Sequence, residues 1–509
     1  MKEYDLITIG TGSSMGIVDG MMQRNPNIKI AVIDKDEPGG ICLTRGCIPS
    51  KILLYPAEVI RTIDRADRFG IDVDIKKIDF KKVMDRMRTL IQKEINMIRN
   101  GLSSSKNIDY YHTKAEFVAP YTLKVDNEEI KSNMILLCTG SKPLKPKIKD
   151  LDKVEYLTSD TILKLEQLPK SIAIVGGGYI AAEYGHFLSS MGSKVTIIGR
   201  NSNLLPQEEP EISELAKREL EKFMKIITNC EVQEITKTTA GKKKIFAIYR
   251  SSGDKKSITA DEVLIATGRG PNTDILNPEA GGIKTDEKGW INVNERLETS
   301  QSNVWALGDT NGKYLFKHVA NSESMVVFYN AVMNMQMKMD YHAVPHAVFT
   351  EPEIASVGLR ENEAIAKHGM QNILIGVQRY QDTAKGEAMD VKDYFVKVIV
   401  EKANMRILGA HIIGPQASVL IQEIINLMYT SDQSARPIID GMHIHPALNE
   451  VVERAFRSLM PPDQYKHVLE HHFKLRPISE EVKTKTCKQC GKEISQEATY
   501  CDKCGSKQD

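Results

Sequence analysis

The chain has 509 residues, of which 41% are hydrophobic and 27% are charged, and its formal net charge is +1. This length predicts three or four domains, and the composition is that of a soluble globular protein. The nearly balanced charge argues against a protein that binds nucleic acid through an extensive basic surface. No apolar run approaches the roughly eighteen residues that span a membrane, so we expect no membrane partner and no nucleic-acid partner.

The N-terminus and the cysteines indicate a cytoplasmic protein. Met1 to Asp5 lead directly into an apolar run, without the charged, apolar and cleavable regions of a secretory signal. Eight cysteines in so long a chain do not make a disulfide scaffold. Cys138 and Cys230 stand alone, and the other six form one pair and a C-terminal group. We therefore expect a reducing compartment and one catalytic disulfide.

A glycine turn follows the first predicted strand. The turn Gly10-Thr-Gly12 is followed by a helical pattern and by a second predicted strand at residues 28–33, which leads into Asp34. Glycines let the backbone approach a pyrophosphate, the helix N-terminus attracts it, and Asp34 is placed to bind a ribose hydroxyl. Met15 stands where a third glycine is usual. On this motif alone, a glycine turn without a ligand is therefore an equal alternative.

Two cysteines follow this predicted nucleotide turn and the strand that leads into Asp34. They stand in Gly-Gly-Ile-Cys42-Leu-Thr-Arg-Gly-Cys47-Ile-Pro-Ser-Lys51. Their spacing is too long for a C-x-x-C redox turn, and no second pair lies nearby to complete a zinc site. Their position predicts a redox-active disulfide beside a bound nucleotide. The alternative is a pair of buried structural thiols.

A second nucleotide turn begins about 165 residues later. A predicted strand at residues 171–175 precedes Gly176-Gly-Gly178-Tyr-Ile-Ala181, which matches the dinucleotide pattern G-x-G-x-x-A. Two such turns, each preceded by a strand, predict two bound dinucleotides.

The end of the next strand, which is predicted at residues 194–198, bears on the choice between NAD and NADP. An acidic residue there would bind the free 2′-hydroxyl of NAD and repel a 2′-phosphate. This chain has Gly199 and then Arg200 at that place, which favours NADPH. Pro206 stands where some NADPH enzymes have a second arginine, so NAD stays an alternative.

The C-terminal tail contains four cysteines in two knuckles. They are Cys487, Cys490, Cys501 and Cys504, each pair followed by glycine. Four thiolates at such spacing predict a tetrahedral structural zinc in a short ribbon, which more plausibly binds a protein partner than catalyses. A redox-active pair of dithiols is the alternative.

Several further motifs occur in the order found in one enzyme family. They are Cys138-Thr139-Gly140, Ala266-Thr-Gly268-Arg, Ala306-Leu-Gly308-Asp309, Thr350-Glu-Pro-Glu353, and His443-Ile-His445-Pro446 through Glu450. With the two glycine turns and the cysteine pair, residues 3–460 resemble the flavin-dependent pyridine-nucleotide disulfide oxidoreductases. This family includes dihydrolipoamide dehydrogenase and the glutathione, mercuric and mycothione reductases.

The resemblance implies an α/β fold with two Rossmann-like nucleotide-binding domains, an α+β dimerisation domain and a small C-terminal zinc ribbon. The FAD-binding domain would comprise residues 1–145 and 270–340, and the NAD(P)-binding domain residues 146–269. Residues 341–465 would form the dimerisation domain, 466–484 a linker, and 485–507 the zinc ribbon.

The resemblance also implies catalytic roles. Cys42 would exchange with the substrate, and Cys47 would face the flavin. His445, oriented by Glu450, would be the acid-base group and would come from the other subunit of a homodimer. The alternative for His445 is an ordinary surface histidine.

A lysine–glutamate pair, Lys51 with Glu183, would lie beside the flavin ring, although an ordinary buried ion pair is the alternative. Tyr179 would cover the nicotinamide pocket, or would simply pack. The implied FAD-binding residues are Gly10, Gly12, Asp34, Lys51, Thr139, Gly140, Gly308 and Asp309. The implied NAD(P)-binding residues are Gly176, Gly178, Tyr179, Arg200 and Gly268.

The predicted function is an FAD-dependent NAD(P)H disulfide oxidoreductase. Electrons would pass between nicotinamide, FAD, the Cys42–Cys47 disulfide and a thiol or disulfide substrate. The substrate is expected to be a dihydrolipoyl group, as in dihydrolipoyl dehydrogenase. The alternatives are NADPH-dependent reduction of a low-molecular-weight thiol disulfide, and a flavoprotein whose ribbon serves mainly to recruit a partner.

Overall fold

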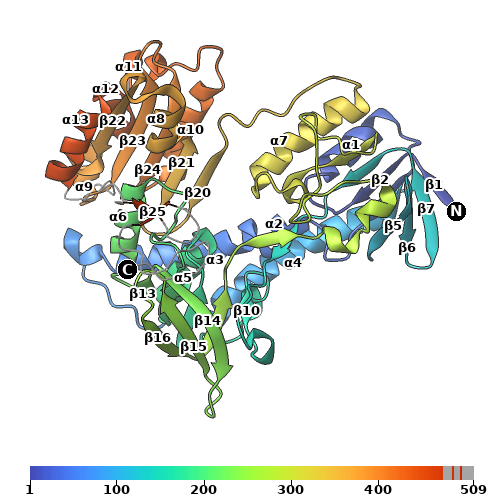
Figure 1. The fold of residues 1–509 in the computed structure, drawn as a ribbon, viewed down its shortest axis with the longest axis horizontal. Helices are drawn as coiled ribbons and strands as arrows, with labels where there is room; N and C mark the ends of the chain where they lie inside the picture. The colour runs from blue at the N-terminus through green and yellow to red at the C-terminus, as the bar shows by residue number, and fades with distance from the viewer. Residues whose placement is uncertain (474–483, 487–492, 496–509) are drawn as a thin grey trace.

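The computed structural model describes residues 1–473, 484–486 and 493–495. Figure 1 shows three α/β parts: the N-terminal sheet and its helices at one end of the long axis, a second sheet below the centre, and a third at the upper left. Helices α2 (Gly40–Arg45) and α3 (Cys47–Ile63) lie between these parts. The predicted fold class is confirmed.

The first sheet is parallel, with strand order β19-β8-β2-β3-β4. Its strands are β2 (Leu6–Ile9), β3 (Ile30–Ile33), β4 (Ile108–Tyr111), β8 (Ile135–Leu137) and β19 (Val304–Ala306). Strands β2 and β3 are wholly buried, as continuous apolar runs between helical layers should be. Strand β19 belongs to residues 270–340, the segment in which the chain returns to this first part. It pairs with β8 and forms one edge of the sheet.

Five helices belong to this part. They are α1 (Met15–Arg24), α2, α3, α4 (Phe80–Ser104) and α7 (Lys317–Val327). In α4 the side chains of Met84, Met87, Ile91 and Ile95 are buried, and their spacing forms one apolar face. Asp79 caps this helix by accepting a hydrogen bond from the Lys82 amide at 3.0 Å. The same part of the chain also contains a smaller, four-stranded sheet. Its strands are β1 (Lys2–Tyr4), β5 (Ala115–Ala119), β6 (Thr122–Val125) and β7 (Glu128–Ser132).

The second parallel sheet has strand order β10-β17-β11-β12-β13. Its strands are β10 (Leu157–Thr158), β11 (Ser171–Val175), β12 (Lys194–Ile198), β13 (Lys225–Ile227) and β17 (Glu262–Ile265), with helices α5 (Tyr179–Ser190) and α6 (Pro210–Leu220). An antiparallel sheet of β14 (Cys230–Lys237), β15 (Lys243–Tyr249) and β16 (Lys255–Ala260) extends from it. The strand pair β9 (Ser141–Pro143) and β18 (Arg269–Pro271) connects the first two parts of the chain.

The third sheet is antiparallel, with strand order β20-β21-β24-β23-β22. Its strands are β20 (Pro345–Val348), β21 (Ile354–Gly358), β22 (Ile373–Arg379), β23 (Phe395–Glu401) and β24 (Ile407–Ile413). Its helices are α8 (Glu361–His368), α9 (Ala384–Ala388), α10 (Ala417–Met428), α11 (Arg436–Asp440), α12 (Glu450–Arg457) and α13 (Pro462–Val468).

A buried ion cluster joins the second and third parts. Lys397 on β23 is fully buried, and its ammonium lies 2.6 Å from Glu211, 2.8 Å from Glu361 and 3.3 Å from Glu209. Glu209 and Glu211 precede or begin α6. Burial lowers the pKa of Lys397, but the surrounding carboxylates more than offset this and hold that pKa well above its ordinary value. Lys397 is therefore charged, and its ion pairs with Glu209 and Glu211 connect the third part to the second.

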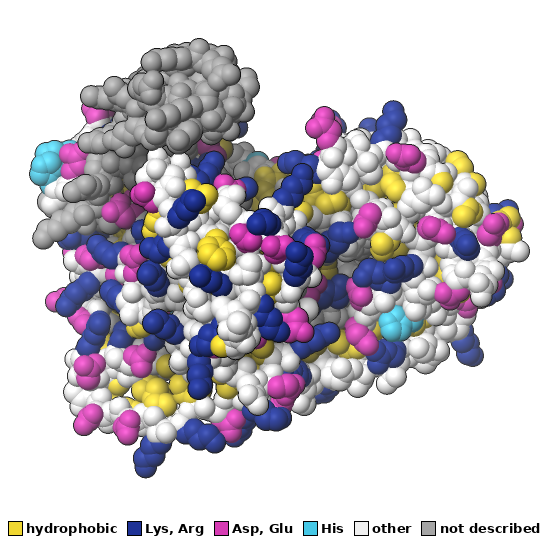
Figure 2. Space-filling model, turned by 60° about the horizontal axis from the view of Figure 1, so that its bottom comes forward, with side chains coloured by type: hydrophobic (Ala, Val, Ile, Leu, Met, Phe, Trp, Pro, Cys, Tyr) yellow, Lys and Arg dark blue, Asp and Glu magenta, His cyan; other side chains and the backbone are white. Residues whose placement is uncertain are grey.

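Basic and acidic side chains are mixed over the face shown in Figure 2, rather than gathered by sign. None of the helices in the described residues has the length and apolar character needed to cross a membrane. Near the C-terminus, β25 (Thr484–Thr486) pairs antiparallel with β26 (Glu493–Ser495). The four tail cysteines predicted to bind zinc lie outside the described residues.

Candidate active site

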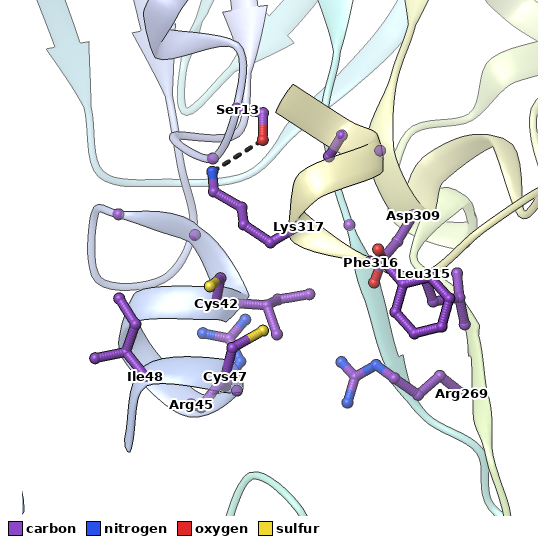
Figure 3. Close-up of a pocket in the computed structure, with 18 of the residues that line it drawn as sticks. Ser13, Cys42, Arg45, Cys47, Ile48, Arg269, Asp309, Leu315, Phe316 and Lys317 are labelled. Carbon is purple, nitrogen blue, oxygen red and sulfur yellow. Dashed lines mark hydrogen bonds between the residues drawn. The ribbon is translucent and has the colours of Figure 1, made fainter. Parts of the chain in front are cut away.

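A cavity of about 990 Å³ lies where the three parts meet. It is lined by the first glycine turn, by α2 and the start of α3, by the start of α5, by residues 307–321 and by the segment 345–349 with α10. Figure 3 shows Cys42 and Cys47 on one side of this space, facing Asp309, Phe316 and Arg269 on the other. Segments far apart in sequence therefore share one elongated space.

The first glycine turn has the geometry of a phosphate-binding turn. Gly10 has φ +109°, and a Cβ atom there would lie 2.1 Å from the carbonyl oxygen of Cys138. A Cβ atom at Gly12 would meet nothing within 4 Å, so the backbone faces open space in the cavity just before α1 begins. Asp34 lines the same end and accepts hydrogen bonds from the amide and hydroxyl of Thr11 at 2.9 and 2.6 Å. Burial raises the pKa of Asp34.

The residues that follow β8 and β19 supply the opposite wall. Thr139, Gly140, Gly308 and Asp309 all line the cavity. The Asp309 carboxylate accepts a hydrogen bond from the Ser141 hydroxyl, and burial raises its pKa. An open glycine turn, a helix N-terminus and carboxylates at both ends suit an extended dinucleotide. The residues therefore fit the FAD that the sequence resemblance implies.

The two cysteines lie in adjacent helices. Cys42 is in α2, Cys47 is the first residue of α3, and both have free thiols. A side-chain hydrogen bond couples the acidities of the Cys42 and Cys47 thiols. This bond, opposed by burial and assisted by the charge of Lys51, lowers the pKa of Cys47 to about 7. The same bond, together with burial, raises the pKa of Cys42. Cys47 is therefore the sulfur that most readily becomes a thiolate.

Lys51 and Glu183 form an ion pair in the cavity wall. The Lys51 ammonium lies 3.0 and 2.8 Å from the two oxygens of the Glu183 carboxylate. It also lies 4.5 Å from the centre of the Phe349 ring. Glu183 accepts a further hydrogen bond from the Phe349 amide at 3.1 Å. The structure thus brings together the two residues predicted as a pair. Lys51 lies one helical turn beyond Cys47 in α3, and Glu183 reaches it from α5.

His445 and Glu450 are also brought together, but away from this cavity. Nδ1 of His445 lies 2.9 Å from Oε1 of Glu450, whose other oxygen accepts from the Ala447 amide at 3.1 Å. The hydrogen bond from His445 holds the pKa of Glu450 below its usual value. The His445 side chain is 67% exposed, and neither residue lines the cavity of its own chain. Within one chain, this pair therefore does not serve Cys42.

The second glycine turn connects β11 to α5. Gly176 has φ +140°, and a Cβ atom there would lie 2.2 Å from the Ala266 carbonyl oxygen, whereas Gly178 and Gly268 face open space. Tyr179, the first residue of α5, lines the main cavity, and burial raises its pKa to about 12. Tyr179 thus stands between the second turn and the cysteine cavity.

Two cationic residues were missed by the sequence analysis. Arg250 follows β15, and its Nη1 donates to the carbonyl oxygen of Arg200 at 3.4 Å. Both guanidinium groups are exposed, and within the described part of the chain neither forms an ion pair. Lys317 lines the cavity and donates to the Ser13 hydroxyl at 2.9 Å. No local motif marks either residue, because each depends on contacts between distant segments.

Comparison with protein families decides the class. The family model described as pyridine nucleotide-disulphide oxidoreductase matches residues 4–332, and its dimerisation domain matches residues 344–456. The chain belongs to the pyridine nucleotide-disulphide oxidoreductase family. This confirms the predicted class of enzyme, whose family implies FAD and NAD(P). A zinc-ribbon domain model matches residues 486–508, which confirms the predicted presence of a ribbon.

Individual relatives cover nearly the whole family region. Mycothione reductase of Mycobacterium tuberculosis strain H37Rv is 38% identical, over 90% of this chain and 100% of that protein. Dihydrolipoyl dehydrogenase of Bacillus subtilis strain 168 is 33% identical, over 89% of this chain and 97% of that protein. The HOCl-induced flavoprotein disulfide reductase RclA from Escherichia coli superposes with a TM-score of 0.78 at 26% identity, over 89% of this chain and 99% of that one. This oxidoreductase thus resembles both types of enzyme expected from the sequence.

Proposed function

We propose that the chain is an NADPH-dependent reductase of a low-molecular-weight thiol disulfide. The observation that carries this choice is the end of β12, where Gly199 and Arg200 replace the acid that would favour NAD. Arg250 adds a second guanidinium beside the Arg200 backbone. Two unpaired, exposed cations at this place suit a 2′-phosphate. The 38% identity to a mycothione reductase supports the same choice.

The cysteine pair would carry out the substrate half of the reaction. FAD, when bound, would pass two electrons from nicotinamide to the Cys42–Cys47 disulfide. The sulfur of Cys42 then attacks the substrate disulfide, forming a mixed disulfide and releasing one thiolate, which takes up a proton. Cys47 attacks Cys42, restores the internal disulfide and releases the second thiol. One substrate disulfide is thereby reduced to two thiols for each internal disulfide formed.

Cys42 needs a base, because its pKa is raised. His445 with Glu450 has the right chemistry but stands outside the cavity of its own chain. We assign this role to His445 of a second copy of the chain. The apolar residues Met442 and Ile444 are also exposed in the isolated chain, which suits a surface that pairs with another copy. The active unit would therefore be a homodimer with shared sites.

For the tail, we propose one zinc ion held by Cys487, Cys490, Cys501 and Cys504, in a ribbon that binds a protein partner. Truncation after about residue 480 should remove the zinc and leave FAD content and reduction of a small disulfide near normal. Zinc analysis of both proteins tests this. A redox-titrating disulfide among these cysteines, without zinc, would contradict it.

Steady-state assays test the main proposal. NADPH and NADH should each be offered with mycothiol disulfide, glutathione disulfide and lipoamide. NADPH with a small-thiol disulfide should give the highest kcat/KM. Preferred turnover of dihydrolipoamide with NAD would contradict the proposal and restore the dihydrolipoyl dehydrogenase prediction, which the 33% identical relatives represent.

A further inference from the structure

Lys317 reaches across the cavity to the first glycine turn. It is the first residue of α7, and its ammonium donates to the Ser13 hydroxyl at 2.9 Å (Figure 3). The same face of α7 holds this turn at two further points. Asn321 accepts from the Ser13 hydroxyl at 3.0 Å, and the Ser324 hydroxyl donates to the Ser13 carbonyl at 2.8 Å. The ammonium is therefore held at the turn rather than free in solvent.

Within the described residues, this ammonium has no negatively charged partner. Four other cations that line the cavity are paired: Lys35 and Arg45 with Asp36, Lys51 with Glu183, and Arg269 with Asp160. Arg86 and Lys114 also line the cavity and form no ion pair within the described residues, but Lys317 is the cation that donates a hydrogen bond to the first glycine turn. Lys317 is half-buried and contacts a neutral hydroxyl, and among residues 1–473 no carboxylate forms an ion pair with it. Two of its three N–H groups thus remain for a ligand.

The position is unfavourable for a cation unless an anion is present. A helix N-terminus carries a partial positive charge, so acidic residues are stabilising there and a lysine is not. Lys317 starts α7, and the turn that it contacts leads into the N-terminus of α1. Two helix N-termini and one ammonium therefore converge beside the open backbone of Gly12. The cavity in front of Gly12 has room for the group that would neutralise them.

We propose that Lys317 is a direct ligand of the FAD diphosphate, a contact made by the returning segment to a group otherwise bound by the N-terminal turn. This rests on FAD being the cofactor of the proposed function. The charge would couple retention of FAD to the docking of α7 against α1. Because the ammonium lies at the phosphate turn, it should affect FAD affinity much more than the reduction potential of the flavin.

Serial dilution of the purified holoenzyme tests the proposal, with the fluorescence of released FAD as the measurement. A charge-assisted hydrogen bond is strong, so Lys317→Met should raise the dissociation constant of FAD by about 10- to 100-fold. Lys317→Arg keeps the charge and should restore most of the affinity. Lys313→Met is the matched control, because Lys313 is exposed four residues away and does not line the cavity. It should release FAD as the wild type does.

Two results would overturn the assignment. One is a wild-type dissociation constant in Lys317→Met. The other is an unchanged dissociation constant with a shifted midpoint potential, which would place the ammonium at the flavin ring instead. A wild-type protein purified without FAD, and unable to take it up, would instead contradict the proposed cofactor itself. The failure of this inference is thus distinguishable from failure of the proposed function.

Discussion

The Cys42 and Cys47 thiols are coupled by a side-chain hydrogen bond, and they differ in acidity. The bond lowers the pKa of Cys47 to about 7 and raises that of Cys42. In the reduced pair, the negative charge therefore resides on Cys47 and the remaining proton on Cys42. Cys47, the sulfur predicted to face the flavin, is the one that ionises more readily, whereas Cys42, the predicted exchange sulfur, keeps its proton to higher pH.

The first prediction concerns this difference in acidity. In the reduced protein, the rate of Cys47 alkylation by iodoacetamide should rise with pH through a midpoint near 7, because the thiolate is the reactive form. Cys42→Ala removes this hydrogen bond, so the midpoint should move up toward the ordinary cysteine value of about 8.5. Peptide mass spectrometry identifies the alkylated residue. An unchanged midpoint in Cys42→Ala would show that the hydrogen bond does not set the pKa.

The second prediction concerns His445. His445→Ala should lower disulfide turnover by about two to four decades, the usual worth of a positioned acid-base group. Reduction of the bound cofactor by NADPH, followed by stopped flow, should change little. His443→Ala is the matched control and should keep its turnover. A parallel loss in the NADPH half-reaction would contradict a role in thiol exchange.

Mixed dimers test whether the site is shared. A dimer of one His445→Ala chain and one Cys42→Ser chain has one site with both groups intact if the dimer is symmetric. It should regain about half of wild-type activity. If each chain supplies both residues to its own site, the mixture stays inactive.

The third prediction concerns Arg200 and Arg250. A hydrogen bond to a charged group contributes about 1.5–3 kcal/mol, so Arg200→Ala should raise KM for NADPH by roughly tenfold or more. Arg250→Ala should act in the same direction, and KM for NADH should change little in either variant. Lys237→Ala removes an exposed cation elsewhere in the same part of the chain and serves as the control. Equal effects on NADH and NADPH would exclude recognition of a 2′-phosphate.

The fourth prediction concerns stability. Lys397→Met leaves the buried Glu209 and Glu211 and the partly buried Glu361 without their cation. Breaking a buried ion pair by removing one partner costs about 3–5 kcal/mol, and denaturant unfolding should show a loss of this size. Lys402→Met, at an exposed position just after β23, should stay within about 0.5 kcal/mol of the wild type. A similarly small loss for Lys397→Met would mean that the cluster gives no net stability.

Local patterns predicted much of this fold. The strands at residues 171–175 and 194–198 match β11 and β12, because short apolar runs before glycine turns leave few alternatives. The predicted strand at residues 28–33 is shorter in the structure, where β3 is Ile30–Ile33. The predicted pairs Lys51–Glu183 and His445–Glu450 are in contact. The first of these depended on the family resemblance, since 132 positions separate its residues.

Other site residues could not be predicted from local sequence. The contact of Arg250 with Arg200 spans 50 positions, and that of Lys317 with Ser13 spans 304. Each depends on how separate sheets pack, and a lone basic residue in a loop or at a helix start gives no signal of that packing. The distance of His445 from the cavity of its own chain likewise depends on tertiary structure, so local sequence does not predict it.

NADPH is expected to reduce one internal disulfide of this oxidoreductase, Cys42–Cys47. Anaerobic addition of one equivalent of NADPH to the oxidised holoenzyme, followed by alkylation and peptide mass spectrometry, tests it most directly. The account predicts that Cys42 and Cys47 become newly alkylated together, while labelling of Cys138 and Cys230 does not change. NADPH oxidation without new thiols at Cys42 and Cys47, or with new thiols at other cysteines, would contradict it.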